Sequence, residues 1–391
     1  MTRLIEITGK VIAGEWGEDD LAGEGIPVLR TTNFTNIGVV NYDNIVTRII
    51  KKKNLKDKLL RYGDIIIEKS GGSDTQPVGR VIFFEGEEEK YLFNNFTGLL
   101  RVKNRNLWNP KYVFYTLFAN YAKGMTVPYE NRTTGLHNLQ TDSYINATEV
   151  INRGINEQNK IVYDIDKVVE LVNLHKKQLK DLDIIIKSRF IEMFGNPVTD
   201  SKNLGFKPLR GFIKNIRYGT STPPVFSDYG FSFIRATNIK NGKVDNKDMK
   251  YIGQEEANKI PKCKLFGGEM IIVRSGVNAG DTCIIDADNI GNYAGYDIII
   301  VFNESVNPVY INELINTHYM DMVVKPLTRR AAQPHLNSEQ VQNLPIVNAP
   351  IELQNQFADF VAQVDKSKLA VQQSLNELET LKKSLMQQYF G

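Results

Sequence analysis

An internal duplication is the feature that most constrains how this chain folds. At an offset of 196 residues, Glu157 to Gly195 aligns without a gap on Leu353 to Gly391, and nine of the 39 aligned positions are identical. The identical pairs are Gln158/Gln354, Asn159/Asn355, Val168/Val364, Leu179/Leu375, Leu182/Leu378, Lys187/Lys383, Ser188/Ser384, Phe194/Phe390 and Gly195/Gly391.

The similarity continues upstream of these two segments, at an offset of 205 residues. Ile26 to Asn33 matches Phe231 to Asn238, and Gly63 to Gly71 matches Gly268 to Gly276. A period near 195 residues is far longer than the roughly 20–50 residues of solenoid repeats. The duplication therefore predicts two similar globular units, each followed by a long helix.

The two aligned C-terminal segments have the apolar spacing of coiled-coil helices. In the first copy, apolar residues alternate in steps of four and three, interrupted by one histidine, and the second copy from Phe357 to Tyr389 keeps the same rhythm. The first set is Ile161, Ile165, Val168, Val172, His175, Leu179, Leu182 and Ile186. At ~1.5 Å per residue, each helix is ~57 Å long. Two such seams in one chain predict an antiparallel pair, which brings both chain ends together.

The fold class expected is α+β, with two duplicated globular units, two long antiparallel helices and pseudo-twofold symmetry. Gly63 to Lys69 and Tyr296 to Phe302 have the β-branched runs of strands. Pro110 to Lys123 and Pro308 to Val324 have helical spacing behind a proline. The expected boundaries are 1–153 for the first unit, 154–195 for its helix, 196–349 for the second unit and 350–391 for the last helix.

Composition is that of an ordinary globular protein. Of the 391 residues, 42% are apolar and 24% are charged, and no stretch has the ~18 apolar residues that a membrane span needs. Cys263 and Cys283 have no counterparts in the first half, so we expect free core thiols and a cytoplasmic location. The net charge of +3 neither requires nor excludes nucleic acid.

The sequence lacks the motifs of common catalytic sites. Neither a phosphate-binding G-x-x-x-x-G-K-[ST] loop nor a G-x-G-x-x-G turn is present, and the four histidines have no metal-ligand spacing. Asp64 and Glu68-Lys69 weakly resemble a nuclease cluster, but the second copy has Val273 in place of Glu68. We therefore expect no catalytic residue, no metal site and no cofactor bound by this chain.

Two repeated loops carry the polar residues that suit nucleic-acid contact. Lys69-Ser70-Gly71 and Arg274-Ser275-Gly276 each end a strand at the place where the two copies begin to diverge, and a second loop follows around 134–140 and 330–337. A cation beside a hydroxyl suits a phosphate, and neighbouring side chains suit bases. The candidates are Lys69, Ser70, Arg80, Arg132, His137, Arg274, Ser275, Arg329, Arg330 and His335. The alternative, internal fold contacts, is preferred for Arg30 and Arg235, which lie in apolar runs.

The order of these features resembles the specificity subunit of type I restriction–modification systems, over essentially the whole chain. A variable unit, a Gln-Asn helix start such as Ile155 to Lys160, a long helix and a Phe-Gly stop occur twice. The family usually has a proline-rich lead into each helix. Leu344 to Pro350 shows this lead, whereas Ile145 to Asn152 does not.

The resemblance implies a non-catalytic reader of double-stranded DNA. Each globular unit would be a target-recognition domain for one half of a bipartite, asymmetric target. The helices would space these domains and dock two modification subunits, which use S-adenosylmethionine to methylate adenine at N6; restriction subunits, which use ATP and Mg²⁺, would join through them. The helix residues assigned to spacing and docking are Gln158, Asn159, Leu179, Leu182, Gln354, Asn355, Leu375 and Leu378.

Two other functions remain open at the level of sequence. One is a coiled-coil adaptor whose globular units bind proteins or glycans, and the other is an enzyme that fuses restriction and methylation. Activity of the purified chain alone would favour the enzyme.

Retention on heparin separates the DNA reader from the adaptor. We expect retention of the purified chain to fall steeply between 50 and 200 mM salt, roughly tenfold or more, because phosphate-like contacts release counterions. Weak retention that does not change with salt would favour the adaptor.

Overall fold

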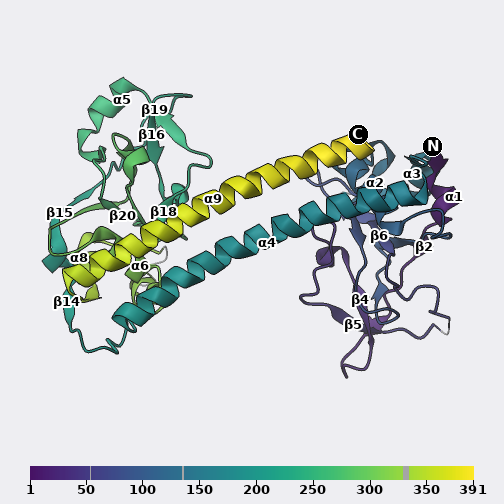
Figure 1. Cartoon of the computed structure of the whole chain (residues 1–391), viewed down its shortest axis with the longest axis horizontal. Coiled ribbons are helices and arrows are strands. Elements are labelled where there is room, and N and C mark those ends of the chain that lie inside the picture. The colour runs from purple at the N-terminus through teal and green to yellow at the C-terminus, as the bar shows by residue number, and fades with distance from the viewer. Residues whose placement is uncertain (53, 134–135, 329–333) are drawn as a thin grey trace. The chain divides into compact units, whose positions relative to one another are not determined.

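The structure is a computed structural model, and it describes residues 1–52, 54–133, 136–328 and 334–391 (Figure 1). The chain forms two compact units. Unit 1 contains Met1–His175 and Ser374–Gly391, and unit 2 contains Lys176–Gln373. Each unit therefore combines a globular part with one portion of each long helix.

Unit 1 is a mixed structure of short strands and helices. Its strands are β1 (Thr2–Arg3), β2 (Ile12–Ala13), β3 (Glu18–Asp19), β4 (Ile26–Leu29), β5 (Val46–Ile49), β6 (Ile65–Glu68), β7 (Ser70–Gly72), β8 (Val81–Phe83), β9 (Leu92–Phe93), β10 (Thr97–Leu100), β11 (Glu130–Thr133), β12 (Leu136–Leu139) and β13 (Glu149–Val150). Its helices are α1 (Leu4–Thr8), α2 (Pro110–Ala122) and α3 (Thr141–Ala147). The central sheet has the order β2-β10-β6-β8, beside sheets β3-β5-β4-β9 and β11-β12-β7, and β1 pairs with β13.

Unit 2 repeats this architecture with different loops. Its strands are β14 (Phe206–Pro208), β15 (Ile213–Tyr218), β16 (Phe231–Ile234), β17 (Ile239–Lys240), β18 (Lys243–Val244), β19 (Lys250–Ile252), β20 (Met270–Ile272), β21 (Thr282–Ile284), β22 (Tyr293–Ala294), β23 (Ile298–Phe302) and β24 (Pro345–Val347). Its helices are α5 (Gln254–Lys259), α6 (Pro308–Ile315), α7 (Lys325–Thr328) and α8 (Ser338–Gln342). The central sheet, β15-β23-β20-β21, has the same order as its counterpart in unit 1.

The central strands form because their β-branched runs are buried on both faces. Ile65, Ile66 and Ile67 of β6 are fully buried, and β6 pairs antiparallel with β10 in the same way that β20 pairs with β23. Burying such residues between a sheet and its covering helices is the main favourable contribution to folding. The predicted α+β class is confirmed.

The two long helices lie where the apolar spacing predicts them, α4 at Ile155–Phe194 and α9 at Ile351–Phe390. In unit 2 the helices run antiparallel, because Phe190 packs on Phe357 at 5.5 Å between ring centroids while Asp183, earlier in α4, pairs with Lys368, later in α9. In unit 1, Phe390 shares the hydrophobic core with Leu4, so both ends of the chain contribute to one core.

The helix predicted from Pro308 to Val324 is interrupted. α6 ends at Ile315, and a short π-helical turn covers Met320–Val324. The hydroxyl of Thr317 donates to the Leu314 carbonyl at 2.7 Å, and the Asn316 amide donates to the Asn312 carbonyl at 2.8 Å. Side chains that bond to nearby backbone groups compete with helical hydrogen bonds, so the polar pair after Ile315 favours the break. Among the described residues, no helix has the length and apolar character required to cross a bilayer.

A buried glutamine joins each long helix to its globular part. In unit 1, Gln158 accepts from the Asn109 backbone N–H at 2.9 Å and donates to the carbonyls of Leu107 and Arg153. The Asn109 side chain in turn donates to Asn159 at 2.8 Å and caps α2.

Unit 2 has the same arrangement, in which Gln354 accepts from the Asn307 N–H at 2.8 Å and donates to the Ala349 carbonyl. The Asn307 side chain donates to Asn355 at 2.9 Å and caps α6. We call Asn109–Gln158–Asn159 and Asn307–Gln354–Asn355 the amide clamps. They hold the start of each long helix against the start of a helix of the globular part, α2 in unit 1 and α6 in unit 2.

Removal of the clamp glutamine should destabilise its own unit. We expect Gln158→Ala to lower the free energy of unfolding of unit 1 by about 1–3 kcal/mol, because it leaves a buried N–H and two carbonyls without partners. The measurement is hydrogen exchange of core amides in β6. The control is Asn159→Ala, which removes an exposed hydrogen bond and should have a smaller effect. Equal losses in the two variants would contradict the assignment.

Candidate nucleic-acid interface

The two repeated loops of unit 1 meet at the end of β6. Strand β7, which begins at Ser70, pairs with β12, and the Ser70 hydroxyl donates to the side-chain oxygen of Asn138. The backbone N–H of Leu139 donates to the carbonyl of Lys69 at 2.8 Å. Two segments that are far apart in sequence thus form one joined surface element, which we call the loop junction of unit 1.

Unit 2 has the same junction with different side chains. Ser275 forms a hydrogen bond with His335 Nδ1 at 2.8 Å, and the N–H of Leu336 donates to the carbonyl of Arg274 at 2.8 Å. Among the sequence candidates, the structure therefore brings together Arg274, Ser275 and His335. Arg329 and Arg330 lie outside the described residues.

The polar candidate residues of unit 1 differ in whether their side chains are already engaged in internal contacts. Arg80 donates to Glu68, with Nε and Nη2 each 2.9 Å from a carboxylate oxygen, and these hydrogen bonds to Glu68 raise the pKa of Arg80. Because Glu68 is only 1% exposed, this pair is an internal fold contact. The structure therefore places Arg80 inside unit 1, with its guanidinium already occupied.

The remaining candidate residues of unit 1, two cations and one histidine, lie near the loop junction. Lys69 is half-buried. Burial of its ammonium group and, to a smaller extent, repulsion from Lys58 lower its pKa. His137 is buried and its Nδ1 lies 2.7 Å from a Glu130 oxygen. Arg132 is exposed and forms an ion pair with Asp74 at 3.2 Å. Among the candidate residues of unit 1, all of which the structure describes, Arg132 is therefore the one with a largely exposed charge.

Glu130 organises the strand that carries Arg132. Burial alone would raise the pKa of Glu130, but hydrogen bonds from His137 and from the Val78 N–H reverse the effect, and the net pKa is lowered. The ionised carboxylate therefore holds the His137 ring through Nδ1. No motif in the sequence singles out Glu130, because its partner His137 lies seven residues away on the neighbouring strand.

Arg274 has an unusual environment in unit 2. Its guanidinium carbon lies 4.6 Å from the ring centroid of Tyr218 and 4.5 Å from that of Tyr296. Its backbone N–H donates to Asp297 at 3.0 Å. Aromatic rings stabilise a guanidinium by cation–π contact and stacking. Tyr218, Tyr296 and Asp297 were not among the sequence candidates, since nothing in the chain order brings Tyr218 to Arg274.

Several charged residues whose sequence pattern suggested a functional site form internal contacts of the fold instead. Arg30 donates to the carbonyl of Asn44 and Arg235 to that of Asp248, which confirms that both are internal contacts. Asp64 is fully buried and accepts two hydrogen bonds from Arg101 at 2.7 and 2.8 Å. The carboxylates of the nuclease-like cluster are thus neutralised by arginines inside the fold.

The helix residues assigned to docking divide into two groups. Gln158 and Gln354 are fully buried in the amide clamps, so their side chains are not accessible to another subunit. Leu375 is buried, and Leu179, Leu182 and Leu378 are partly buried. Asn159 and Asn355 are exposed residues but bond within their clamps. The exposed large apolar side chains of the helices are Tyr163, Leu171, Leu174, Ile184, Ile185, Ile191, Leu369 and Leu381.

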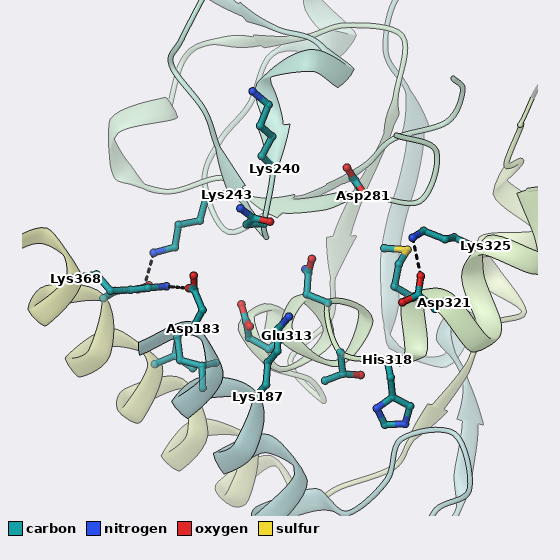
Figure 2. A pocket seen from close by; sticks show the side chains of 17 residues that line it. Asp183, Lys187, Lys240, Lys243, Asp281, Glu313, His318, Asp321, Lys325 and Lys368 are labelled. Atoms are coloured by element: carbon teal, nitrogen blue, oxygen red, sulfur yellow. Dashed lines mark hydrogen bonds and ion pairs between the residues drawn. The ribbon is translucent and has the colours of Figure 1, made fainter. Parts of the chain in front are cut away.

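A pocket of about 520 Å³ lies within unit 2, where the β17–β18 hairpin, α6, the end of α4 and the start of α9 meet (Figure 2). Three of its lysines form ion pairs with carboxylates of the lining: Lys243 with Asp365 at 2.5 Å, Lys368 with Asp183, and Lys325 with Asp321 at 2.6 Å.

Burial raises the pKa of Glu313, which also lines this pocket. In the described part of the chain, no cluster of three or more His, Cys, Asp or Glu residues suits a metal ion. The balanced ion pairs identify this pocket as the joint between the globular part of unit 2 and its helices.

Asp297 gives unit 2 a pH-dependent stability. Burial raises its pKa to about 6, although the Arg274 N–H and charge favour the ionised form. Since an unfolded Asp titrates near ~3.9, the native state binds the extra proton, and the contribution is full below about pH 4 and lost as pH rises through about 6. We expect Asp297→Asn to abolish this pH dependence and to raise the free energy of unfolding at pH 7 by at most about 3 kcal/mol. Urea unfolding of the wild type and the variant between pH 4 and 7 measures this difference. Identical pH profiles of the two proteins would contradict the prediction.

Comparisons with known proteins agree with this organisation. Residues 215–380 match the family model described as the type I restriction modification DNA specificity domain. A putative type I restriction enzyme MjaX specificity subunit of Methanocaldococcus jannaschii is 21% identical over 189 residues, which cover 47% of this chain and 44% of the relative. The match thus spans less than half the length of that curated relative.

The fold is similar to solved structures over the whole chain. The type I restriction–modification S subunit of M. genitalium has a TM-score of 0.59 at 14% identity, covering 100% of this chain and 95% of its own. A chain from a structure of type I R-M complex assembly and conformational transition has a TM-score of 0.56 at 15% identity, covering 100% and 96%. These likenesses concern the fold. With the family match, they agree with the resemblance found in the sequence: residues 215–380 are similar to the type I restriction modification DNA specificity domain, and the whole chain is similar in fold to type I specificity subunits.

Proposed function

We propose that this chain is the DNA-reading subunit of a type I restriction–modification complex, with no catalytic role of its own. Unit 1 and unit 2 each dock one half of a bipartite DNA target through their loop junctions. The observation that carries the proposal is that the same junction is built twice, at the end of the central strand of each unit, with different side chains at matched positions.

The differences between the junctions favour an asymmetric target. Unit 1 has Lys69 and Asn138 where unit 2 has Arg274 and His335. Lysine acts on phosphate as a point charge, whereas arginine and asparagine recognise base edges with defined geometry. Two half-sites of unlike sequence therefore suit the two units.

The long helices are proposed to set the gap between half-sites. Each has 40 residues, which is ~60 Å at ~1.5 Å per residue. This length exceeds one turn of DNA, ~34–36 Å, so segments on similar faces of the duplex are within reach. The exposed apolar side chains of the helices suit docking of two modification subunits.

The chemistry would belong to the partners. Two modification subunits would bind S-adenosylmethionine and methylate adenine at N6 after flipping the base out of the duplex. Restriction subunits would use ATP and Mg²⁺ for translocation and cleavage. This chain would supply sequence recognition and spacing in the cytoplasm, where the complex meets DNA.

Selection from a random-sequence duplex library tests the reading function. We expect the purified full-length chain to enrich a motif with two unlike specified halves separated by an unspecified gap. Sequencing of the retained duplexes is the measurement. A single contiguous motif, or no motif at all, would contradict the proposal.

The same library tests the spacing role. One heptad inserted after His175 in α4 and another after Gln373 in α9 lengthen both helices by ~10.5 Å and keep the seam in phase. We expect the gap to lengthen by about three base pairs, since DNA rises ~3.4 Å per pair, while both halves stay the same. The matched control is an insertion of equal length in the exposed turn at Gly23. An unchanged gap with altered halves would rule out the spacing role.

A further inference from the structure

We infer that Arg274 reads the major-groove edge of a guanine in the half-site bound by unit 2, and that Tyr218 and Tyr296 position its guanidinium for this contact. The inference rests on the proposed function and names a base and a specificity-determining residue for it. It is argued from the fixed geometry of this one arginine.

The backbone of Arg274 is held at both ends. Its N–H donates to the buried carboxylate of Asp297 at 3.0 Å, and its carbonyl accepts from Leu336 at 2.8 Å. It follows Val273, which is fully buried at the end of the central strand. The side chain therefore starts from a rigid point, as precise recognition of a base requires.

The guanidinium is fixed as well. Tyr218 and Tyr296 both contact it, at 4.6 and 4.5 Å from the guanidinium carbon to the ring centroids. Tyr218 is itself anchored, because its hydroxyl accepts from the Ser338 N–H at 2.9 Å. Among the described residues the Arg274 Nε is buried and has no hydrogen-bond partner, while the residue as a whole stays partly exposed.

The surroundings suit approach to a groove. Gly276 turns the chain with φ of 93°, and Val277, next in the loop, is 97% exposed. His335, across the junction, is held through Nδ1 by Ser275. Arg274 thus lies beside a projecting loop rather than inside the core.

A fixed planar fork points to guanine more than to phosphate. The O6 and N7 atoms of guanine accept two parallel hydrogen bonds from arginine, and this is the commonest specific base contact. A phosphate can be bound by lysine as a point charge, whereas two parallel hydrogen bonds to a base edge need a planar fork. Unit 1 has Lys69 at the matched position, and its nearby Arg80 is bound to Glu68, so the same reading is assigned to unit 2 alone.

The test uses the full-length chain and a random-sequence duplex library, followed by titration with the selected duplex. Wild type should require a guanine in one half-site. Both Arg274→Gln and Arg274→Lys should lose that requirement and bind the selected duplex roughly 10- to 100-fold more weakly, with the other half-site unchanged. The control Lys207→Gln removes a cation–π contact with Phe212 elsewhere in unit 2 and should leave the motif unchanged.

A substrate analogue makes the test independent of variant folding. Replacing the required guanine by 7-deazaguanine removes the N7 acceptor, and wild type should then bind roughly tenfold more weakly. The same replacement should have no effect on Arg274→Gln.

The outcomes separate the two proposals. If Arg274→Lys keeps the guanine and Arg274→Gln merely weakens all duplexes equally, Arg274 contacts phosphate and the inference is overturned. A bipartite motif that no Arg274 variant alters also overturns it, while the proposed function stands. A wild-type chain that selects no motif removes both.

Discussion

The amide clamps are the interactions on which the rest of the structure depends. In each unit an asparagine caps a helix of the globular part, α2 or α6, and a fully buried glutamine from the long helix accepts from the backbone N–H of that asparagine. Buried amides are costly unless they are fully hydrogen-bonded, so the clamp has one favourable geometry. It therefore defines how each long helix leaves its own globular part.

With the clamps common to both units, divergence is confined to the parts that need not match. The central sheets keep one strand order and both junctions keep their serine, yet the contacts beside them differ. Unit 1 buries Glu68 against Arg80, while unit 2 has Val273 there, and Asp297 accepts a hydrogen bond from the Arg274 backbone N–H instead. One duplicated scaffold thus leaves an arginine occupied in one copy and stacked on tyrosines in the other.

The sequence predicted the fold well because its signals are local or periodic. Heptad spacing located α4 and α9 to within about a residue, and the duplication predicted matched units. It predicted the site less well, because the decisive contacts join distant segments. Nothing in the sequence shows that Arg80 is paired with Glu68. Tyr218, which contacts Arg274, lies 56 positions before it in the chain. Alternation along a strand shows which face a residue takes but not which neighbour it meets.

The division of the chain between units has a consequence for its biosynthesis. Unit 1 includes Ser374–Gly391, and Phe390 packs on Tyr112 at 5.3 Å within its core. Residues 1–175 of unit 1 are translated long before Ser374–Gly391, so the core of unit 1 is completed only after those residues are made. Domains usually fold in order from the N-terminus. Unit 2, which is contiguous from Lys176 to Gln373, has all its residues earlier. Unit 2 can therefore complete its fold on the ribosome before unit 1 does.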